Sequence, residues 1–316
     1  MEFIQYLNDK VLKLKRPVVA IGNFDGVHVG HQEIFRRVRQ RAAEIGGDAV
    51  VLSLDPHPLF VLAPEQRPSL LSTLEEKRGV IESLGIDCFI LIHFDKAFSK
   101  VSPEGFVQKI LKEQLQVEEV FVGYDFTFGH RAAGNPKLLT ELGKKYGFQV
   151  KTVEPISLDG VPVSSSIIRE FVREGQIQKA TQFLGRYPTL LGKVVHGMDR
   201  GKKVVGFATA NLNPTKDLVP KDGVYACWAR VEQKWFFGVA NVGINPTFKD
   251  NPFTVEVHIL DFSRDLYGEE ITLAFTERLR DEKVFPDPKA LSDQIKRDVE
   301  EAKENLLKLP KPILGA

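Results

Sequence analysis

Two histidines three residues apart, with a glycine between them, are the residues of this sequence best suited to chemistry. His28 and His31 lie in the stretch VAIGNFDGVHVGHQ, residues 19–32, and the whole chain of 316 residues has only seven histidines. Imidazoles can donate hydrogen bonds to phosphate oxygens, and glycines let a phosphate approach the backbone closely. The pattern therefore suggests a phosphate site, although an isolated His-x-x-His pair is more often a surface or capping pair.

The elements on either side of the pair favour the functional interpretation. Residues 18–24 begin as an apolar strand, and a helix is expected from Gly30 or His31 to Ile45. Ligands bind beyond the carboxyl ends of parallel strands, and the N-terminus of a helix favours anions. Nucleotidyl transfer suits such a site, because it depends mainly on aligning a phosphate nucleophile with an α-phosphate and on stabilising the growing charge.

The first half of the chain alternates short apolar runs with helical patterns. This rhythm predicts βαβ units, and therefore a Rossmann-like α/β domain with a parallel sheet. The expected strands are residues 18–24, 49–54, 88–93, 119–124 and 148–153, and the expected helices are residues 31–45, 74–84, 103–115 and 136–146.

The rhythm changes near residue 186, where we place the boundary between a domain of residues 1–185 and one of residues 186–316. Short alternating runs separated by glycine and proline predict an antiparallel sandwich or small β-barrel, followed by a terminal helix over residues 289–307. The expected strands of this half are residues 190–195, 224–231, 234–242, 254–261 and 270–275.

Composition excludes several classes of protein. The net charge of +1 gives no basic excess for nucleic acid or an anionic membrane, and no apolar run approaches the roughly 20 residues of a membrane span. Two distant cysteines, Cys88 and Cys227, make a disulfide framework implausible. The first ten residues lack the pattern of a signal peptide, so we expect a cytoplasmic protein.

A second helix start follows the last strand of the first half. Ser164, Ser165 and Ser166 are suited to cap a helix, and Arg169 would add a charged fork for a pyrophosphate group. Taken alone, this stretch is better explained as a plain helix cap with a solvated arginine.

The second half carries its own candidate residues. A basic glycine loop, residues 196–203, could wrap polyphosphate, and Thr209 and Asn211 would share one face of an extended segment, where their oxygens suit Mg²⁺. In the alternating run TVEVHILDF, residues 254–262, Glu256 shares a face with His258 and could take a proton from an alcohol. Taken alone, Thr209 and Asn211 are better explained as an ordinary polar turn, and Glu256 as a solvent-exposed residue on the polar face of a strand.

The motifs of the first half resemble the HxGH-type nucleotidyltransferases. GNFDGVHVGHQ and SSSIIRE carry that likeness, and LDPHP and VGYDFTFGH narrow it to the FMN adenylyltransferase half of bacterial bifunctional riboflavin kinase/FAD synthetases. The resemblance implies catalytic histidines at 28 and 31. It implies further ATP-phosphate residues Gly22, Asn23, Phe24, Asp25, Gly30, Ser164, Ser165 and Arg169, and flavin-lining residues Asp125, Phe126 and Phe128.

The second half resembles the riboflavin kinase domain of the same family, through GKVVHG, RGKKVVGF, ATANL, DGVYA, GVANVGINPTF, TVEVHILDF and RLRDEKVF. The resemblance implies Glu256 as general base and Thr209 and Asn211 as the Mg²⁺-binding pair. It also implies ATP contacts at Gly197, Arg200 and Lys202 and flavin contacts at Arg280 and Asp281. Ala208 stands where the family has proline, so altered kinase kinetics are expected.

The resemblance implies two Mg²⁺-dependent, ATP-consuming steps: phosphorylation of riboflavin to FMN, then adenylylation of FMN to FAD with release of pyrophosphate. Two alternatives stay open. The first domain could serve another phosphorylated acceptor, such as pantetheine phosphate or nicotinamide mononucleotide. The barrel could instead be a binding module on a degenerate transferase.

Overall fold

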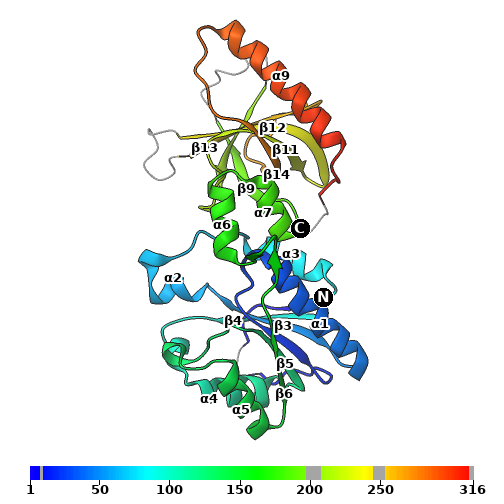
Figure 1. Ribbon diagram of the computed structural model, residues 1–316, viewed down its shortest axis with the longest axis vertical. Helices are drawn as coiled ribbons and strands as arrows, with labels where there is room; N and C mark the ends of the chain where they lie inside the picture. Colours follow the sequence, from blue (N-terminus) through cyan, green and yellow to red (C-terminus); the bar gives the residue numbers. More distant parts are fainter. Residues whose placement is uncertain (8–9, 197–207, 245–252, 313–316) are drawn as a thin grey trace. The chain divides into compact units, whose positions relative to one another are not determined.

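The computed structural model describes residues 1–7, 10–196, 208–244 and 253–312 and divides into two compact units (Figure 1). The first comprises residues 1–68 and 74–164, and the second comprises residues 69–73 and 165–314. Helices α6 (Ser165–Arg173) and α7 (Ile177–Leu184) therefore belong to the same compact unit as the barrel strands. The domain boundary at residue 185 stays a prediction.

The first unit is built on a six-stranded parallel sheet, which confirms the predicted fold class. Its strand order is β1-β4-β3-β2-β5-β6, and every neighbouring pair is parallel. The strands are β1 (Glu2–Ile4), β2 (Val18–Ile21), β3 (Ala49–Asp55), β4 (Cys88–His93), β5 (Glu119–Gly123) and β6 (Gln149–Val153). The short edge strand β1 was not predicted, because three residues carry no readable alternation.

Helices cover both faces of this sheet, which explains why its strands are apolar without interruption. Side chains such as Val19 and Ile21 pack with Leu111 and Leu139 in one cluster, and Figure 1 shows α1 on one side of the sheet and α4 and α5 on the other. The helices are α1 (Val29–Ile45), α2 (Pro58–Leu62), α3 (Leu74–Ser83), α4 (Pro103–Phe106), a π-helical continuation (Val107–Gln114) and α5 (Pro136–Tyr146). The expected single helix over residues 103–115 thus changes its winding at Val107. A short hairpin, β7 (Ser157–Leu158) with β8 (Val161–Pro162), ends the unit.

The second unit is a closed antiparallel barrel, which settles the choice between sandwich and barrel. Its order is β10-β13-β12-β11-β14-β9. The strands are β9 (Thr189–Val195), β10 (Ala210–Pro214), β11 (Gly223–Val231), β12 (Lys234–Ile244), β13 (Phe253–Ile259) and β14 (Glu270–Arg280). The last strand runs five residues beyond the predicted end at Phe275, so Arg280 is a strand residue, aligned with Val224.

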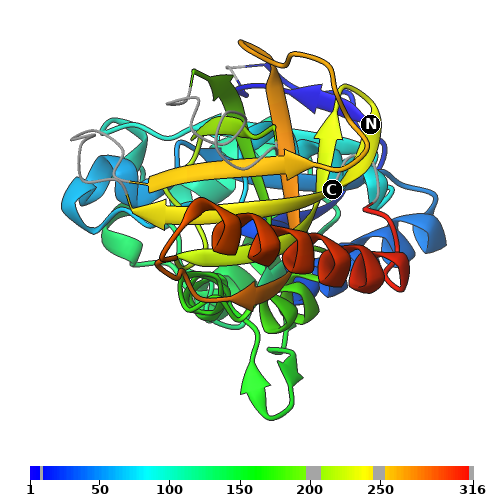
Figure 2. The ribbon, with the colours of Figure 1, turned by 90° about the horizontal axis from the view of Figure 1, so that it is seen from above.

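The terminal helix α9 (Pro288–Leu307) lies against the outside of the barrel, as Figures 1 and 2 show. Ala302 and Leu306 are fully buried there against a patch on β11 and β12 that includes Trp228 and Trp235. Asp287 caps the helix by accepting a hydrogen bond from the Ala290 N–H at 2.8 Å. The barrel interior is a separate apolar core, with Val255, Val257 and other inward side chains.

Candidate active sites

The predicted histidine site lies where the parallel sheet changes its winding direction. From β2 the chain moves outward through β3 and β4, whereas β5, the other neighbour of β2, starts the opposite half of the sheet. In open α/β sheets the crevice beyond the carboxyl ends of two such strands is the preferred ligand site. Gly22 to Asp25 follow β2, and Tyr124 and Asp125 follow β5, so both turns lie at this edge of the sheet.

His28 and His31 stack face to face at the start of α1. Their ring centroids lie 3.5 Å apart with an angle of 20° between the planes. His28 is the N-cap residue, and the helix begins at Val29, slightly earlier than predicted. Residues three apart in the first turn share a helix face, so both imidazoles lie beside the N–H groups of the helix N-terminus. This arrangement provides donors and a positive dipole end for one anion.

Phe24 packs against His31, which in turn stacks on His28. It has a left-handed backbone (φ 49°) and is almost fully buried, and its ring meets His31 edge-on at 5.1 Å and Phe35 at 4.8 Å. The glycines fit around these rings. A Cβ at Gly22 would lie 2.9 Å from the Phe24 ring, and one at Gly30 would lie 3.2 Å from the His28 ring. The glycines therefore make room for aromatic side chains, a reason that the sequence analysis did not give.

Asn23, in the turn after β2, is contacted by three side chains that the sequence analysis did not predict. The Asn23 carbonyl accepts hydrogen bonds from Lys77 Nζ at 2.8 Å and Ser53 Oγ at 3.1 Å, and Asn23 Nδ2 lies 3.4 Å from His57 Nε2. Burial lowers the pKa of Lys77, while the carboxylates of Asp25 and Asp55 act in the opposite direction. His57 lies in the LDPHP motif, which carried the resemblance but gave no predicted site residue. Lys77 lies in a charged helical run that resembles a solvated face.

The flavin-lining candidates follow β5 on the neighbouring strand end. Phe126 and Phe128 stack at 5.5 Å, but Phe128 is buried in the core cluster that also holds Phe106. Asp125 is exposed. Phe128 thus anchors this loop to the hydrophobic core. The flavin-lining role of the three residues stays a prediction.

The predicted serine turn precedes α6, as expected, but Arg169 is not solvated. Helix α6 starts at Ser165, one residue after Ser164. Arg169 is 8% exposed, and its Nε donates to the Ser69 carbonyl at 2.8 Å. This bond holds the segment of residues 69–73 within the second unit. One donor of the Arg169 guanidinium is therefore used in a hydrogen bond to the backbone.

The kinase candidates form a row on the outside of the barrel. Glu256 on β13 is aligned with Asn211 on β10 and with Asn241 on β12, and directly opposite residues in antiparallel strands share a face. The neighbours of Glu256 in the chain, Val255 and Val257, point into the barrel core, which confirms the predicted alternation. All three members of the row are half-buried.

The sequence analysis did not predict Asn241 as a site residue, although it noted the motif GVANVGINPTF. The alignment of Asn241 with Glu256 depends on the register of β12 against β13. Asn241 Nδ2 lies 3.4 Å from Glu282 Oε1, so a second carboxylate reaches this face from the segment after β14. Thr209 is exposed just before β10. His258 Nδ1 lies 2.8 Å from the Ala208 carbonyl oxygen and fixes this approach to the strand. Gly197, Arg200 and Lys202 lie outside the described residues.

Arg280 and Asp281, the flavin candidates, are engaged within the protein. Arg280 makes a bidentate ion pair with Asp298 of α9, with an Nη2–Oδ2 distance of 2.7 Å and an Nε–Oδ1 distance of 3.0 Å. Asp298 is 2% exposed and also accepts from Gln294. Asp281 accepts from Arg278 at 2.6 Å, and this bond lowers the pKa of its carboxyl. Contact of either residue with flavin stays a prediction.

The oxygen atoms of Thr209 and Asn211 fit Mg²⁺. Mg²⁺ prefers oxygen ligands and is usually bound by one or two protein groups together with substrate phosphates. The Thr209 hydroxyl and the Asn211 amide oxygen are such groups. Within residues 1–7, 10–196, 208–244 and 253–312 no cluster of three histidine, cysteine or carboxylate side chains could hold a metal by itself.

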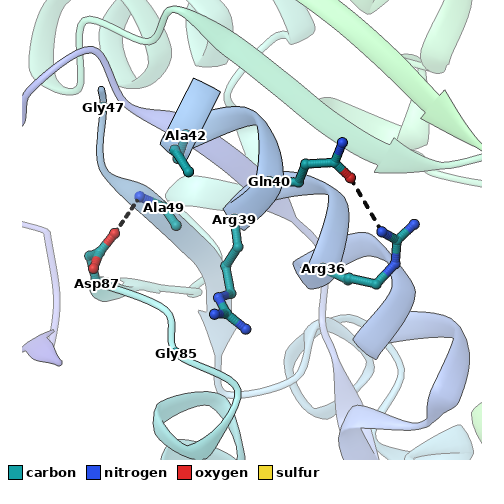
Figure 3. Close-up of a pocket in the computed structure, with 9 residues that line it drawn as sticks. Arg36, Arg39, Gln40, Ala42, Gly47, Ala49, Gly85 and Asp87 are labelled. Atoms are coloured by element: carbon teal, nitrogen blue, oxygen red, sulfur yellow. Dashed lines mark hydrogen bonds between the residues drawn. The ribbon is translucent and has the colours of Figure 1, made fainter. Parts of the chain in front are cut away.

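A hollow of about 550 Å³ elsewhere on the first unit is not part of either site (Figure 3). It is lined by the later turns of α1 and by the amino-terminal ends of β3 and β4, including Arg39, Gly47 and Asp87. Asp87 accepts from the Ala49 N–H at 2.8 Å, and Arg36 donates to Gln40 at 3.3 Å. Ligands of parallel sheets bind at the other end of the strands.

Comparison with known proteins decides the family. A family model described as FAD synthetase matches residues 11–167, and one described as riboflavin kinase matches residues 184–306. The chain belongs to the bifunctional riboflavin kinase/FMN adenylyltransferase family. A relative of that name from Listeria monocytogenes is 37% identical over 92% of this chain and 93% of its own length. Relatives of the same name from Haemophilus influenzae and Escherichia coli are 34% and 33% identical, covering 96% and 91% of this chain and 98% and 92% of their own lengths.

A solved structure of similar fold carries a different name. The structure titled "Macrolide-efflux Protein from Streptococcus pneumoniae" has a TM-score of 0.85 and 28% identity, and the match covers 96% of this chain and 99% of that one. None of the helices in the described part of this chain is long and apolar enough to cross a membrane.

Proposed function

We propose that this chain makes FAD from riboflavin in two steps, with one site on each unit. The barrel transfers the γ-phosphoryl group of ATP to riboflavin and gives FMN and ADP. The first unit transfers AMP from a second ATP to FMN and gives FAD and pyrophosphate. The observation that carries the proposal is the presence, on one chain, of a stacked imidazole pair at a helix N-terminus and a Glu256 row flanked by amides.

In the adenylylation step, an FMN phosphate oxygen attacks the α-phosphorus of ATP, and the bond from that phosphorus to the pyrophosphate oxygen breaks. The nucleophile is already ionised, so no strong base is needed. His28 and His31 donate hydrogen bonds to phosphate oxygens, and the first N–H groups of α1 stabilise the negative charge that develops there. Gly22 to Asp25, Gly30 and Ser164 are proposed to line the polyphosphate, and the phosphate-binding roles of Ser165 and Arg169, which belong to the second unit, stay predictions.

In the kinase step, Glu256 accepts the proton of the ribityl primary hydroxyl as its oxygen attacks the γ-phosphorus and the bond to ADP breaks. Asn211, beside Glu256, and Thr209 are proposed to hold Mg²⁺ with ATP. When bound, Mg²⁺ neutralises phosphate charge in both reactions. The alternatives of another acceptor or a purely binding barrel are not favoured, because the FAD synthetase model matches residues 11–167 and the riboflavin kinase model matches residues 184–306. A cytoplasmic location stays a prediction.

The test is a single assay with purified full-length protein, riboflavin, ATP and Mg²⁺, with the flavins separated by chromatography over time. FMN is expected to appear first and FAD second, and FMN supplied directly is expected to give FAD with release of pyrophosphate. A chain that makes FMN but leaves it unadenylylated would overturn the function of the first unit. Pantetheine phosphate and nicotinamide mononucleotide, offered in place of FMN, test the alternative acceptors.

A further inference from the structure

Lys77 on α3 lies beneath the histidine turn rather than on a solvated helix face. It is partly buried, and its Nζ donates to the Asn23 carbonyl at 2.8 Å. The same oxygen accepts from Ser53 Oγ of β3 at 3.1 Å. Two side chains from two elements therefore hold one backbone carbonyl, and the bond from the ammonium is the stronger type, because its donor is charged.

The surroundings of Lys77 explain why the fold tolerates a lysine here. Burial of an ammonium is costly unless it is paired and hydrogen-bonded. The carboxylates of Asp25, which is 4% exposed, and Asp55, at the end of β3, provide the opposing negative charge. Asp55 itself accepts a hydrogen bond from Tyr6 at 2.9 Å. The negative charges of Asp25 and Asp55 therefore oppose the effect of burial on Lys77 at the carboxyl edge of the sheet.

A short series of contacts connects this cation to the imidazoles. The Asn23 carbonyl belongs to the peptide that enters Phe24, where the backbone turns into the left-handed region. The Phe24 ring packs edge-on against His31, and His31 stacks on His28. A displaced Asn23 peptide would therefore move the Phe24 ring and both histidines with it.

We propose that Lys77 is a positioning residue for adenylyl transfer, whose ammonium fixes the Asn23 carbonyl and thereby the stacked pair of His28 and His31. The inference rests on the proposed function of the first unit. A displacement of catalytic groups by about 1 Å can cost about a hundredfold in rate, because the gain from alignment is lost. Lys77 need not touch either substrate to have this effect.

The experiment compares Lys77→Met and Lys77→Arg with wild type in the full-length protein. For Lys77→Met, kcat for FMN to FAD is expected to fall about 10- to 100-fold, the equivalent of one hydrogen bond to a charged group. The KM values for ATP and FMN are expected to stay within about threefold, because substrate contacts are kept. Lys77→Arg keeps the charge and a donor and is expected to restore most of kcat.

Two controls separate positioning from loss of protein. Lys145→Met removes an exposed lysine that pairs with Glu104 in the same unit, and it is expected to leave both reactions unchanged. Riboflavin phosphorylation by the barrel, measured in the same samples, is expected to stay at the wild-type rate in every variant. Ser53→Ala removes the other donor to the same oxygen and is expected to lower kcat in the same direction by a smaller factor.

A spectroscopic measurement tests the geometry without turnover. The Hε1 proton resonances of His28 and His31, assigned by single His→Ala variants, carry ring-current shifts from each other and from Phe24. Lys77→Met and Ser53→Ala are expected to move these two resonances and leave that of His130 in place.

The outcomes are distinguishable. A wild-type protein that makes no FAD overturns the proposed function itself. With an active wild type, unchanged kcat in Lys77→Met overturns the inference, and so does a raised KM for ATP at unchanged kcat, since the lysine would then bind the nucleotide. If Lys77→Met does not fold, Ser53→Ala decides: unmoved histidine resonances and unchanged kcat overturn the inference.

Discussion

The sheet edge and the barrel face of this chain present polar groups in different ways. On the sheet, a turn places imidazoles at a helix N-terminus, and Phe24, Asp25 and His28 in this turn are each less than 9% exposed. On the barrel, Asn211, Glu256 and Asn241 stand in a row on an outer face and are half-buried. The first arrangement suits donation to phosphates, and the second suits acceptance of a proton and oxygen ligation of a metal.

The difference follows from the strand periodicity of each fold. Parallel strands buried on both faces can offer function only beyond their ends, so the loop after β2 must carry it. Antiparallel barrel strands bury one face and leave alternate residues outside, so Glu256 can sit in the middle of a strand. The candidate phosphate-binding residues of the first unit therefore lie on a loop, whereas the candidate proton acceptor of the second unit lies on a strand face.

The largest effect is expected from removing the proposed base, Glu256, which distinguishes the kinase site from the adenylylation site. Glu256→Gln keeps the size of the side chain but cannot accept the proton, so riboflavin phosphorylation is expected to fall about 10²- to 10⁴-fold. FAD formation from supplied FMN is expected to continue at the wild-type rate. Initial rates of both reactions in one preparation make the measurement. A variant that still makes FMN at the wild-type rate would contradict the proposed base.

The reciprocal change removes the imidazoles. His28→Ala and His31→Ala each delete a proposed donor to the phosphates, and each is expected to lower FAD formation about 10²- to 10³-fold. Riboflavin phosphorylation is expected to be unaffected. His130→Ala is the matched control, because this exposed histidine lies on the sheet unit and its Nδ1 lies 3.0 Å from the Ser99 carbonyl oxygen. Equal loss of both reactions would show that the two sites do not act separately.

A third change asks whether Arg280 serves the flavin or the fold. Asp298→Ala leaves the partly buried Arg280 guanidinium without its bidentate partner, and breaking a buried pair costs about 3–5 kcal/mol. Both tryptophans of the chain, Trp228 and Trp235, lie in the barrel beneath α9, so tryptophan fluorescence during urea unfolding reports on this unit.

The double variant Arg280→Met/Asp298→Leu provides the control, because it removes both charges and is expected to regain most of the stability. If the double variant is stable and phosphorylates riboflavin with an unchanged KM for riboflavin, Arg280 is a structural residue and the predicted flavin contact is wrong. A raised KM in a stable protein would support the contact. An unfolding midpoint of Asp298→Ala equal to that of wild type would contradict the structural role.

Sequence reasoning found the parts of these sites that are local in the chain. The apolar run, the glycines and the two histidines lie within 14 residues, and the alternation around Glu256 lies within one strand, so both could be read directly. Lys77 could not, because its burial depends on a turn 54 residues earlier in the chain. Asn241 could not, because only the register of β12 against β13 aligns it with Glu256.

The smallest expected effect concerns the exposed side of α1, the helix that carries the imidazoles. Glu33 accepts from Arg36 Nε at 2.6 Å and from Arg37 Nε at 2.7 Å. The hydrogen bond from Arg36, with a further one from Arg37, lowers the pKa of Glu33 to about 2 against the opposing effect of burial. Because these pairs are largely exposed, Glu33→Gln is expected to cost no more than about 1 kcal/mol of stability at pH 7.

The contribution of Glu33 to the free energy of unfolding is expected to depend on pH. A carboxyl whose pKa is lower in the folded state than its ordinary value of 4.5 stabilises the fold above that value and loses the effect as the pH falls toward 2. The difference in unfolding free energy between wild type and Glu33→Gln, measured by calorimetry, is therefore expected to be constant from about pH 7 to 5 and to shrink below 4.5. FAD formation at pH 7 is expected to be unchanged, because Glu33 pairs with Arg36 and Arg37 on α1 and is not one of the residues proposed to contact substrate. A loss of adenylylation in Glu33→Gln would mean that the sheet site depends on the surface of α1 as well as on the residues beneath the histidine turn.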